Sequence, residues 1–134
     1  MLTDAGPLVA LINRGDKHHL KCAHAMNVVT APLSTSWPCF TEAMYLLYTL
    51  GGYHFQNMLW QWRRDGRLVL LDISSQEADL MDRLMQKYSD LPMDAADASL
   101  VALAESRGDK RIFTLDSDFF VYRLSDGTML DIVG

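Results

Sequence analysis

The chain has 134 residues, a length that suits one domain with a substantial core and is short for two. Its composition, 49% hydrophobic and 22% charged, excludes a disordered chain, and no apolar run is long enough to span a bilayer. The formal net charge of −5 argues against nucleic-acid binding through a generally basic surface.

The first half of the chain predicts short strands alternating with helices. Strands are expected at residues 1–3 and 31–35. Gly6-Pro7 predicts a turn into a short helix with proline near its first position. Further helices are expected at residues 17–27, 38–50 and 53–64, with Gly51-Gly52 separating the last two.

The second half continues the alternation. A continuous apolar run predicts a buried strand at residues 67–73, and a capping box formed by Ser74 and Glu77 opens a helix that extends to about Tyr88. After a break at residues 90–92, a helix is expected at 94–107, followed by strands at 111–115 and 128–133.

This order predicts an α/β fold, a three-layer α/β/α sandwich with a mainly parallel central sheet, in a single domain spanning residues 1–134. Ligands of such sheets bind beyond the carboxyl ends of the strands. Asp4 and the pair Asp116 and Asp118 fall at that edge.

Six acidic residues occupy junctions between the expected elements. They are Asp4, Glu42, Asp94, Asp97, Asp116 and Asp118. A fold that gathers carboxylates from distant segments creates repulsion that a bound divalent cation relieves. Without these six, 12 basic residues face 11 acidic ones (17 − 6), so the net acidity can be concentrated in one site and RNA or DNA stays possible as a substrate.

The spacing of these acids strengthens the hypothesis of a metal site. Asp94 and Asp97 are three residues apart, so on a helix both lie along one face of its first turn. Glu42 is a lone carboxylate in an apolar segment, where an unpaired buried charge is costly.

Each acid also has a purely structural interpretation. Asp94 has about even odds of being only a helix N-cap. Asp116 and Asp118 can be turn residues, Asp4 can shape the Gly-Pro turn, and Glu42 can face solvent. The hypothesis depends on all six occurring at mutually consistent places.

Four motifs resemble the PIN-domain nucleases, especially the compact toxins of VapBC-type toxin–antitoxin pairs. They are residues 2–11 (Leu-Thr-Asp-Ala-Gly-Pro-Leu-Val-Ala-Leu), 41–43 (Thr-Glu-Ala), 93–105 (Met-Asp-Ala-Ala-Asp-Ala-Ser-Leu-Val-Ala-Leu-Ala-Glu) and 114–119 (Thr-Leu-Asp-Ser-Asp-Phe). The resemblance covers essentially the whole chain. It implies a parallel sheet between helices, in agreement with the pattern above.

By position, the resemblance implies a metal-binding quartet of Asp4, Glu42, Asp97 and either Asp116 or Asp118. Asp94 matches a frequently acidic position, and Thr114 a common polar neighbour. The family uses Mg²⁺ or Mn²⁺ to hydrolyse RNA phosphodiesters. Two departures are a first strand of only three residues and the ambiguity between Asp116 and Asp118.

The resemblance also implies partners: an RNA substrate, a cognate antitoxin protein and a second copy in a homodimer. The alternative is a catalytically silent PIN-like module that binds RNA or protein, although such modules usually lack one or more of the acids. Arg63 and Arg64 are basic residues able to contact RNA, yet such residues are usually solubilising. The aromatic and Met-rich segment 44–62 is expected in the core or in a partner interface.

The cellular setting expected from the sequence is a reducing cytoplasm, with no membrane partner. The N-terminus lacks the basic and apolar regions of a signal peptide. Cys22 and Cys39 form neither a metal-ligand spacing nor a disulfide framework, and are expected as core residues.

Overall fold

Five parallel strands form the sheet at the centre of the computed structural model, which describes residues 1–29 and 32–134. The strands are β1 (Leu2–Thr3), β2 (Leu33–Ser36), β3 (Leu68–Leu71), β4 (Arg111–Phe113) and β5 (Asp131–Val133), in the order β3-β2-β1-β4-β5. Leu2 of β1 is paired with Ser34 on one side and with Ile112 on the other. The shortest strand is therefore central, held from both sides.

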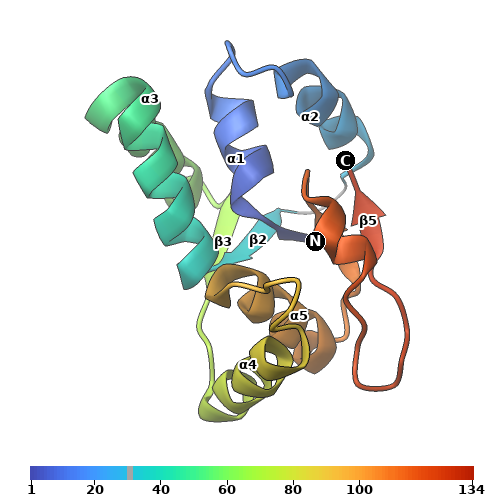
Figure 1. Ribbon diagram of the computed structural model, residues 1–134. Helices are drawn as coiled ribbons and strands as arrows, with labels where there is room; N and C mark the ends of the chain where they lie inside the picture. Colours follow the sequence, from blue (N-terminus) through green and yellow to red (C-terminus); the bar gives the residue numbers. More distant parts are fainter. Residues whose placement is uncertain (30–31) are drawn as a thin grey trace.

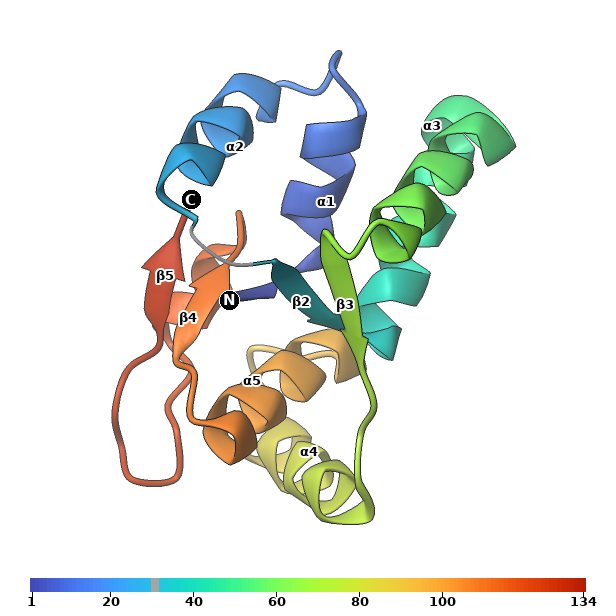
Figure 2. The same cartoon turned by 180° about the vertical axis from the view of Figure 1, so that it is seen from behind.

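Helices cover both faces of this sheet. On one face lie α1 (Ala5–Ile12), α2 (His19–Ala25) and α3 (Trp37–Arg64); on the other lie α4 (Ser75–Lys87) and α5 (Ala95–Arg107), as Figures 1 and 2 show from opposite sides. Two short 3₁₀ turns, η1 (Met26–Val28) and η2 (Ser117–Phe120), complete the regular structure. The predicted three-layer α/β/α sandwich with a parallel sheet is confirmed.

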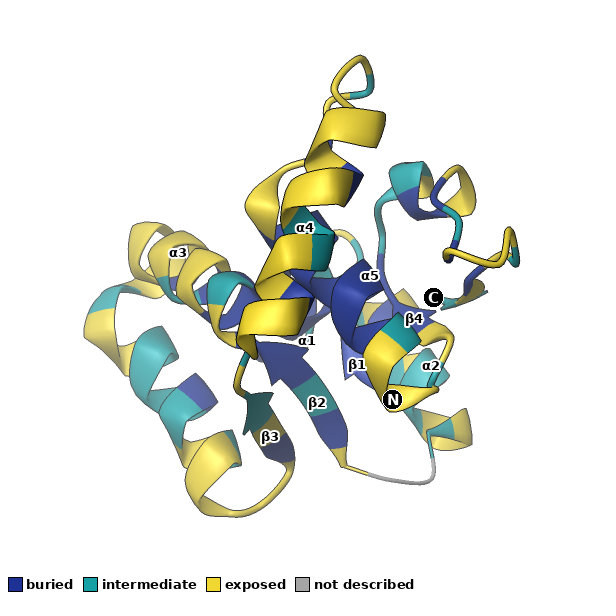
Figure 3. Cartoon of the chain, turned by 90° about the horizontal axis from the view of Figure 1, so that it is seen from below, coloured by how far each residue is buried: buried dark blue, intermediate teal, exposed yellow. Residues whose placement is uncertain are grey.

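Each face of the sheet has its own hydrophobic core. The core beneath α1 to α3 includes Leu8, Leu47 and Leu59, and the core beneath α4 and α5 includes Leu100 and Leu103. Residues 96–104 of α5 are all buried, because α4 covers the helix from outside (Figure 3). The small residues of this segment allow α5 to pack closely against the sheet, and this packing holds the first turn of the helix in position.

Helix α3 is a hairpin of two arms. The predicted separation of two helices at Gly51-Gly52 is confirmed, and the reversal of the chain there is a finding of the structure. Gly52 has φ 64° and ψ −156°, and the chain reverses there. The rings of Phe40 and Trp60 consequently lie 4.8 Å apart, although a straight helix would separate twenty residues by roughly 30 Å. The two arms lie side by side in Figure 2. In the described ranges, no helix is long and apolar enough to cross a membrane.

Several element boundaries differ from those predicted. The strands expected at 67–73, 111–115 and 128–133 are shorter, at Leu68–Leu71, Arg111–Phe113 and Asp131–Val133. The helix expected at 17–27 ends at Ala25 and continues as the η1 turn. Ala31, predicted to start the second strand, lies outside the described residues, and β2 extends to Ser36. The apolar runs are longer than the stretches that pair, because strand length depends on the neighbouring strand.

Gly52→Ala is expected to destabilise the protein by about 1–3 kcal/mol, because a side chain is strained at this backbone conformation. Denaturant unfolding followed by circular dichroism measures the change. Gly6→Ala is the matched control: its added Cβ would lie 3.7 Å from the Leu115 side chain, an ordinary contact, inside helix α1. Equal unfolding midpoints for the two variants would contradict the role of Gly52.

Candidate metal centre

Asp4 lies where β1 passes into α1. Its backbone N–H donates to the Phe113 carbonyl across the sheet at 2.9 Å, so β4 holds its position. Its side chain is the N-cap of α1, with Oδ1 accepting from the Ala5 N–H at 2.8 Å. A buried carboxylate is thereby fixed at the carboxyl end of the central strand.

A chain of hydrogen bonds joins Asp4 to the segment that follows β4. The Thr114 hydroxyl donates to Asp4 Oδ2 at 2.9 Å and accepts from the Asp116 N–H at 3.0 Å. Asp116 Oδ1 in turn accepts from the Asp118 N–H at 2.9 Å and caps the η2 turn. The tight turn after β4 therefore depends on residues that also hold Asp4.

Helix α5 begins at the same edge of the sheet, because a helix that leads into a parallel strand runs antiparallel to it. Asp94 is its N-cap, with Oδ1 accepting from the Asp97 N–H at 2.8 Å. Asp97 is buried and its Oδ2 accepts from the Tyr122 hydroxyl at 2.8 Å. The capping interpretation of Asp94 is confirmed, and Asp97 is anchored by a residue far along the chain.

Tyr122 is itself held rigidly. It is fully buried, and its ring makes edge-to-face contacts with Tyr88 and Phe119, each at a centroid distance of 5.1 Å. Its hydroxyl therefore has a defined direction when it donates to Asp97.

Glu42 differs from the other acids of the cluster. It lies in the first arm of α3 and is exposed, so the expectation that it carries a costly buried charge is wrong. Helix α3 is amphipathic, with Phe40, Ala43 and Leu47 facing the core while Glu42 faces solvent. Glu42 is therefore the solvent-exposed member of the group, and it is linked to Asp4, Asp94 and Asp116 through their charges.

The electrostatics show that the acids act on one another. Burial raises the pKa of Asp97 to about 7, and the charges of Asp94, Asp4 and Asp116 raise it further. The hydrogen bond from Tyr122 acts in the opposite direction. Burial also raises the pKa of Asp4, opposed by the bonds from Ala5 and Thr114 and reinforced by Asp116 and Asp94. The pKa of Glu42 is raised by partial desolvation, then by Asp4, Asp94 and Asp116.

This donor set fits a hard divalent cation. All the side chains offer carboxylate oxygens, and within residues 1–29 and 32–134 no basic side chain lies within ion-pair distance of any of the six acids. A cation would offset the burial and the mutual repulsion that together raise these pKa values. In the same described ranges, however, no three acidic, His or Cys side chains form a compact ligand group.

Asp116 and Asp118 have different surroundings. The charge of Asp116 raises the pKa values of Asp4, Glu42 and Asp97, whereas that of Asp118 does not figure among their causes. Asp118 and Asp116 both add to the burial and the Asp97 contact that raise the pKa of Tyr122, the residue that donates to Asp97. Asp116 therefore acts on the clustered carboxylates themselves, and Asp118 acts on the tyrosine that holds one of them.

Sequence reasoning missed three polar side chains that support the cluster. The hydroxyl groups of Ser36 and Ser99 are 2.6 Å apart and join the start of α3 to α5. Tyr122 has no local signal at all. The only signal for Ser36 was its place directly before a helix, where serine is a common N-cap.

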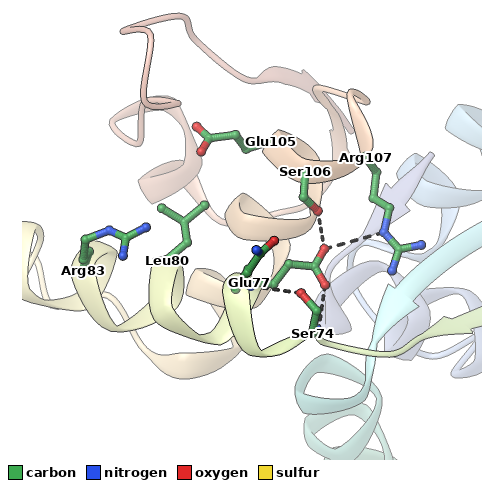
Figure 4. A pocket seen from close by; sticks show the side chains of 8 residues that line it. Ser74, Glu77, Leu80, Arg83, Glu105, Ser106 and Arg107 are labelled. Carbon is green, nitrogen blue, oxygen red and sulfur yellow. Dashed lines mark hydrogen bonds and ion pairs between the residues drawn. The ribbon is translucent and has the colours of Figure 1, made fainter.

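The cleft between α4 and α5 has a structural role. Its volume is about 400 Å³, and Figure 4 shows Glu77 at its centre. Glu77 closes the predicted capping box with Ser74, accepts a hydrogen bond from Ser106 and lies 3.6 Å from Arg107 Nε. These polar groups are hydrogen-bonded or ion-paired with one another, and their contacts across the cleft connect α4 to α5. The cleft is separate from the acidic cluster.

Several solved structures share the fold of this chain. The chain is similar in structure to the Mycobacterium tuberculosis toxin VapC20, which cleaves the sarcin-ricin loop (TM-score 0.84, 16% identity, 99% of this chain and 98% of that one). It is also similar to a chain of a Klebsiella pneumoniae toxin–antitoxin complex (TM-score 0.68, 20% identity, 88% of each chain).

A third similar structure is Rickettsia felis VapBC2 bound to a DNA fragment from its promoter (TM-score 0.68, 14% identity, 99% of this chain and 98% of that one). No curated protein matches the chain by sequence. The family model for the PIN domain matches residues 1–123. The chain therefore belongs to the PIN-domain family.

Proposed function

We propose that this protein is a divalent-metal-dependent endoribonuclease and the toxin of a toxin–antitoxin pair. The observation that carries the proposal is the uncompensated acidic cluster, in which Asp4, Glu42 and Asp97 all have raised pKa values at the carboxyl edge of a PIN-domain sheet. Metal-assisted hydrolysis of a phosphodiester needs such a set of hard oxygen ligands.

In this proposal Asp4, Glu42, Asp97 and Asp116 hold Mg²⁺ or Mn²⁺. When bound, the cation supplies Lewis acidity toward the phosphodiester and charge for its transition state. Thr114 and Tyr122 orient Asp4 and Asp97 through hydrogen bonds of 2.9 and 2.8 Å, which limits the directions these carboxylates can take. Asp94 caps α5 and adds negative charge beside the ligands. Asp118 is retained only as an alternative to Asp116.

RNA is the proposed substrate because VapC20, which shares the fold, is a toxin that cleaves the sarcin-ricin loop. The cognate antitoxin is a proposed partner, since two other similar structures are toxin–antitoxin assemblies. Around the tip of the α3 hairpin, exposed apolar side chains support a protein interface, with an antitoxin or in a homodimer. They are Tyr45, Leu46, Tyr48, Leu50 and Tyr53. The proposal also includes that the protein is a single domain located in the cytoplasm, which is consistent with an RNA substrate and with an antitoxin partner.

The alternative is a PIN-like module that binds RNA or protein without cleaving it. The presence of every acid implied by the family resemblance favours the enzyme. A binding module has no need to keep Asp97 in an environment that raises its pKa to about 7.

The test is cleavage of a panel of structured RNAs by the purified protein. We expect endonucleolytic products with Mn²⁺ or Mg²⁺, none with EDTA, and recovery when Mn²⁺ exceeds the chelator. Calorimetry of Mn²⁺ binding to the same protein provides a second readout that needs no substrate. Cleavage that persists unchanged in EDTA, or no cleavage despite metal binding, would refute the proposed enzyme.

A further inference from the structure

A groove of about 430 Å³ lies along the outer edge of β3, the end strand of the sheet. We call it the Trp37 groove. Its polar and aromatic lining comes from Trp37 and Asp72 at one end and from Arg63, Arg64 and Gly66 at the other. Along β3 it is lined by Leu68, Val69 and Leu70, which together span roughly 10 Å.

Trp37 is an exposed aromatic ring that is nevertheless fixed in place. It is 40% exposed, packs edge-to-face on Phe40 at 5.6 Å and donates from Nε1 to Asp72 Oδ1 at 3.1 Å. An exposed ring held from two sides offers a flat face for stacking at little entropic cost.

The other end of the groove is positively charged. Arg63 and Arg64 end the second arm of α3, which the reversal at Gly52 returns to the edge strand. Arg64 is oriented by hydrogen bonds to Asn57 and Gln61, at 3.2 and 3.1 Å. Across the described part of the chain, no carboxylate lies within 4.0 Å of either guanidinium, so both charges are available to an anion.

The aromatic end of the groove lies at the carboxyl edge of the sheet, the edge that also carries Asp4, because Trp37 and Asp72 follow the ends of β2 and β3. Trp37 is the first residue of α3, directly after Ser36 at the carboxyl end of β2. Two residues later, Cys39 Sγ lies 3.9 Å from Asp4 Oδ1. The aromatic end is therefore the end near the carboxylates, and the basic end is the more distant one.

We propose that the Trp37 groove binds a single-stranded segment of the nucleic-acid substrate beside the cleavage site, with a base stacked on Trp37 and backbone phosphates at Arg63 and Arg64. This rests on the proposed function. The Asp72 carboxylate accepts hydrogen bonds and so suits the amino groups of a base, whereas it repels an acidic peptide. An aromatic face followed by unpaired guanidinium groups matches the alternation of base and phosphate along a strand.

The test is binding of a labelled single-stranded RNA, about ten nucleotides long, to the full protein in EDTA, over a series of salt concentrations. We expect Trp37→Leu to raise Kd about tenfold and Trp37→Phe to recover most of the loss, because phenylalanine keeps a stacking face. Arg63→Gln combined with Arg64→Gln should weaken binding and reduce the slope of log Kd against log salt by about 1.4, about 0.7 for each phosphate contact to a single strand. Both arginines are exposed, so this pair tests the groove even if Trp37→Leu unfolds the protein.

Arg83→Gln is the matched control, since Arg83 is an exposed arginine of α4 on the opposite face. Cleavage of the RNA panel by the same variants separates the two proposals. If the wild type cleaves RNA while all variants bind it as tightly as the wild type does, the groove proposal is overturned and the nuclease stands. Groove-dependent binding without any cleavage supports the groove and overturns the nuclease. Variants that bind the RNA as tightly as the wild type but lose binding to a protein partner would also overturn the groove proposal.

Discussion

Asp97→Asn is expected to reduce RNA cleavage at least about 100-fold while making the metal-free protein more stable. The loss follows because an amide is a poor ligand for Mg²⁺ or Mn²⁺, and altered metal surroundings alone commonly cost 10–100-fold. The gain in stability follows because burial and neighbouring carboxylates raise the pKa of Asp97 to about 7, so ionisation there opposes folding. The amide oxygen still accepts from the Tyr122 hydroxyl.

The stability gain should depend on pH with a definite sign. Between the unfolded pKa, 3.8, and the folded value, about 7, the native state holds a proton that the unfolded state has lost. The contribution of Asp97 to stability therefore falls as pH rises through this window. The variant should exceed the wild type by about 1–2 kcal/mol at pH 8 and by little at pH 4, after allowance for solvent screening. Urea unfolding in EDTA at both pH values measures this.

Asp118→Asn is the matched control for the same experiment. The proposal makes Asp116 the ligand, and the Asp118→Asn variant keeps the backbone N–H that donates to Asp116 Oδ1, so it should retain most of the cleavage activity. If Asp118→Asn removed activity as fully as Asp97→Asn, then Asp118, not Asp116, would be the fourth ligand.

Glu77→Ala is expected to destabilise the protein by about 2–4 kcal/mol, the largest effect away from the acidic cluster. The substitution removes one buried carboxylate and leaves the Ser74 N–H and the Ser106 hydroxyl without their partner, while Arg107 keeps its hydrogen bond to the Asp72 carbonyl. It also removes the polar contacts between α4 and α5, the helix that carries Asp97, although the apolar packing of the two helices remains. Denaturant unfolding measures the change, with Asp79→Ala, an exposed acid on α4, as the control within about 0.5 kcal/mol.

The Glu77 effect should weaken in acid. Burial alone would raise its pKa, but hydrogen bonds from Ser106 and Ser74 and the charge of Arg107 outweigh burial and hold the pKa below its usual 4.5. An acid with a lowered pKa stabilises the fold above its unfolded pKa, and this stabilisation is lost as pH falls through the folded value. The difference between wild type and Glu77→Ala should therefore shrink below about pH 4.5. A constant difference from pH 7 to pH 3 would argue against the carboxylate as its source.

The accuracy of the sequence prediction followed the range of the interactions involved. The capping box at Ser74, the cap at Asp94 and the helix break at Gly51-Gly52 involve residues a few positions apart, and the structure contains all three. Strand ends were less accurate, because apolar runs such as 67–73 extend beyond the residues that pair with β2. The burial expected for Glu42 was wrong, because which side of α3 faces the core depends on how the helix packs.

By itself, the sequence determined the order of strands and helices, and therefore the sheet edge where Asp4, Asp94 and Asp116 lie. Local propensity and the parallel βα arrangement suffice for that. Only the tertiary structure decided that Tyr122 anchors Asp97, that Thr114 bonds Asp4 across 110 residues and that Trp37 lies in one groove with Arg63. Burial, charge and hydrogen-bond direction depend on neighbours distant in the chain, and these set the environment of each carboxylate.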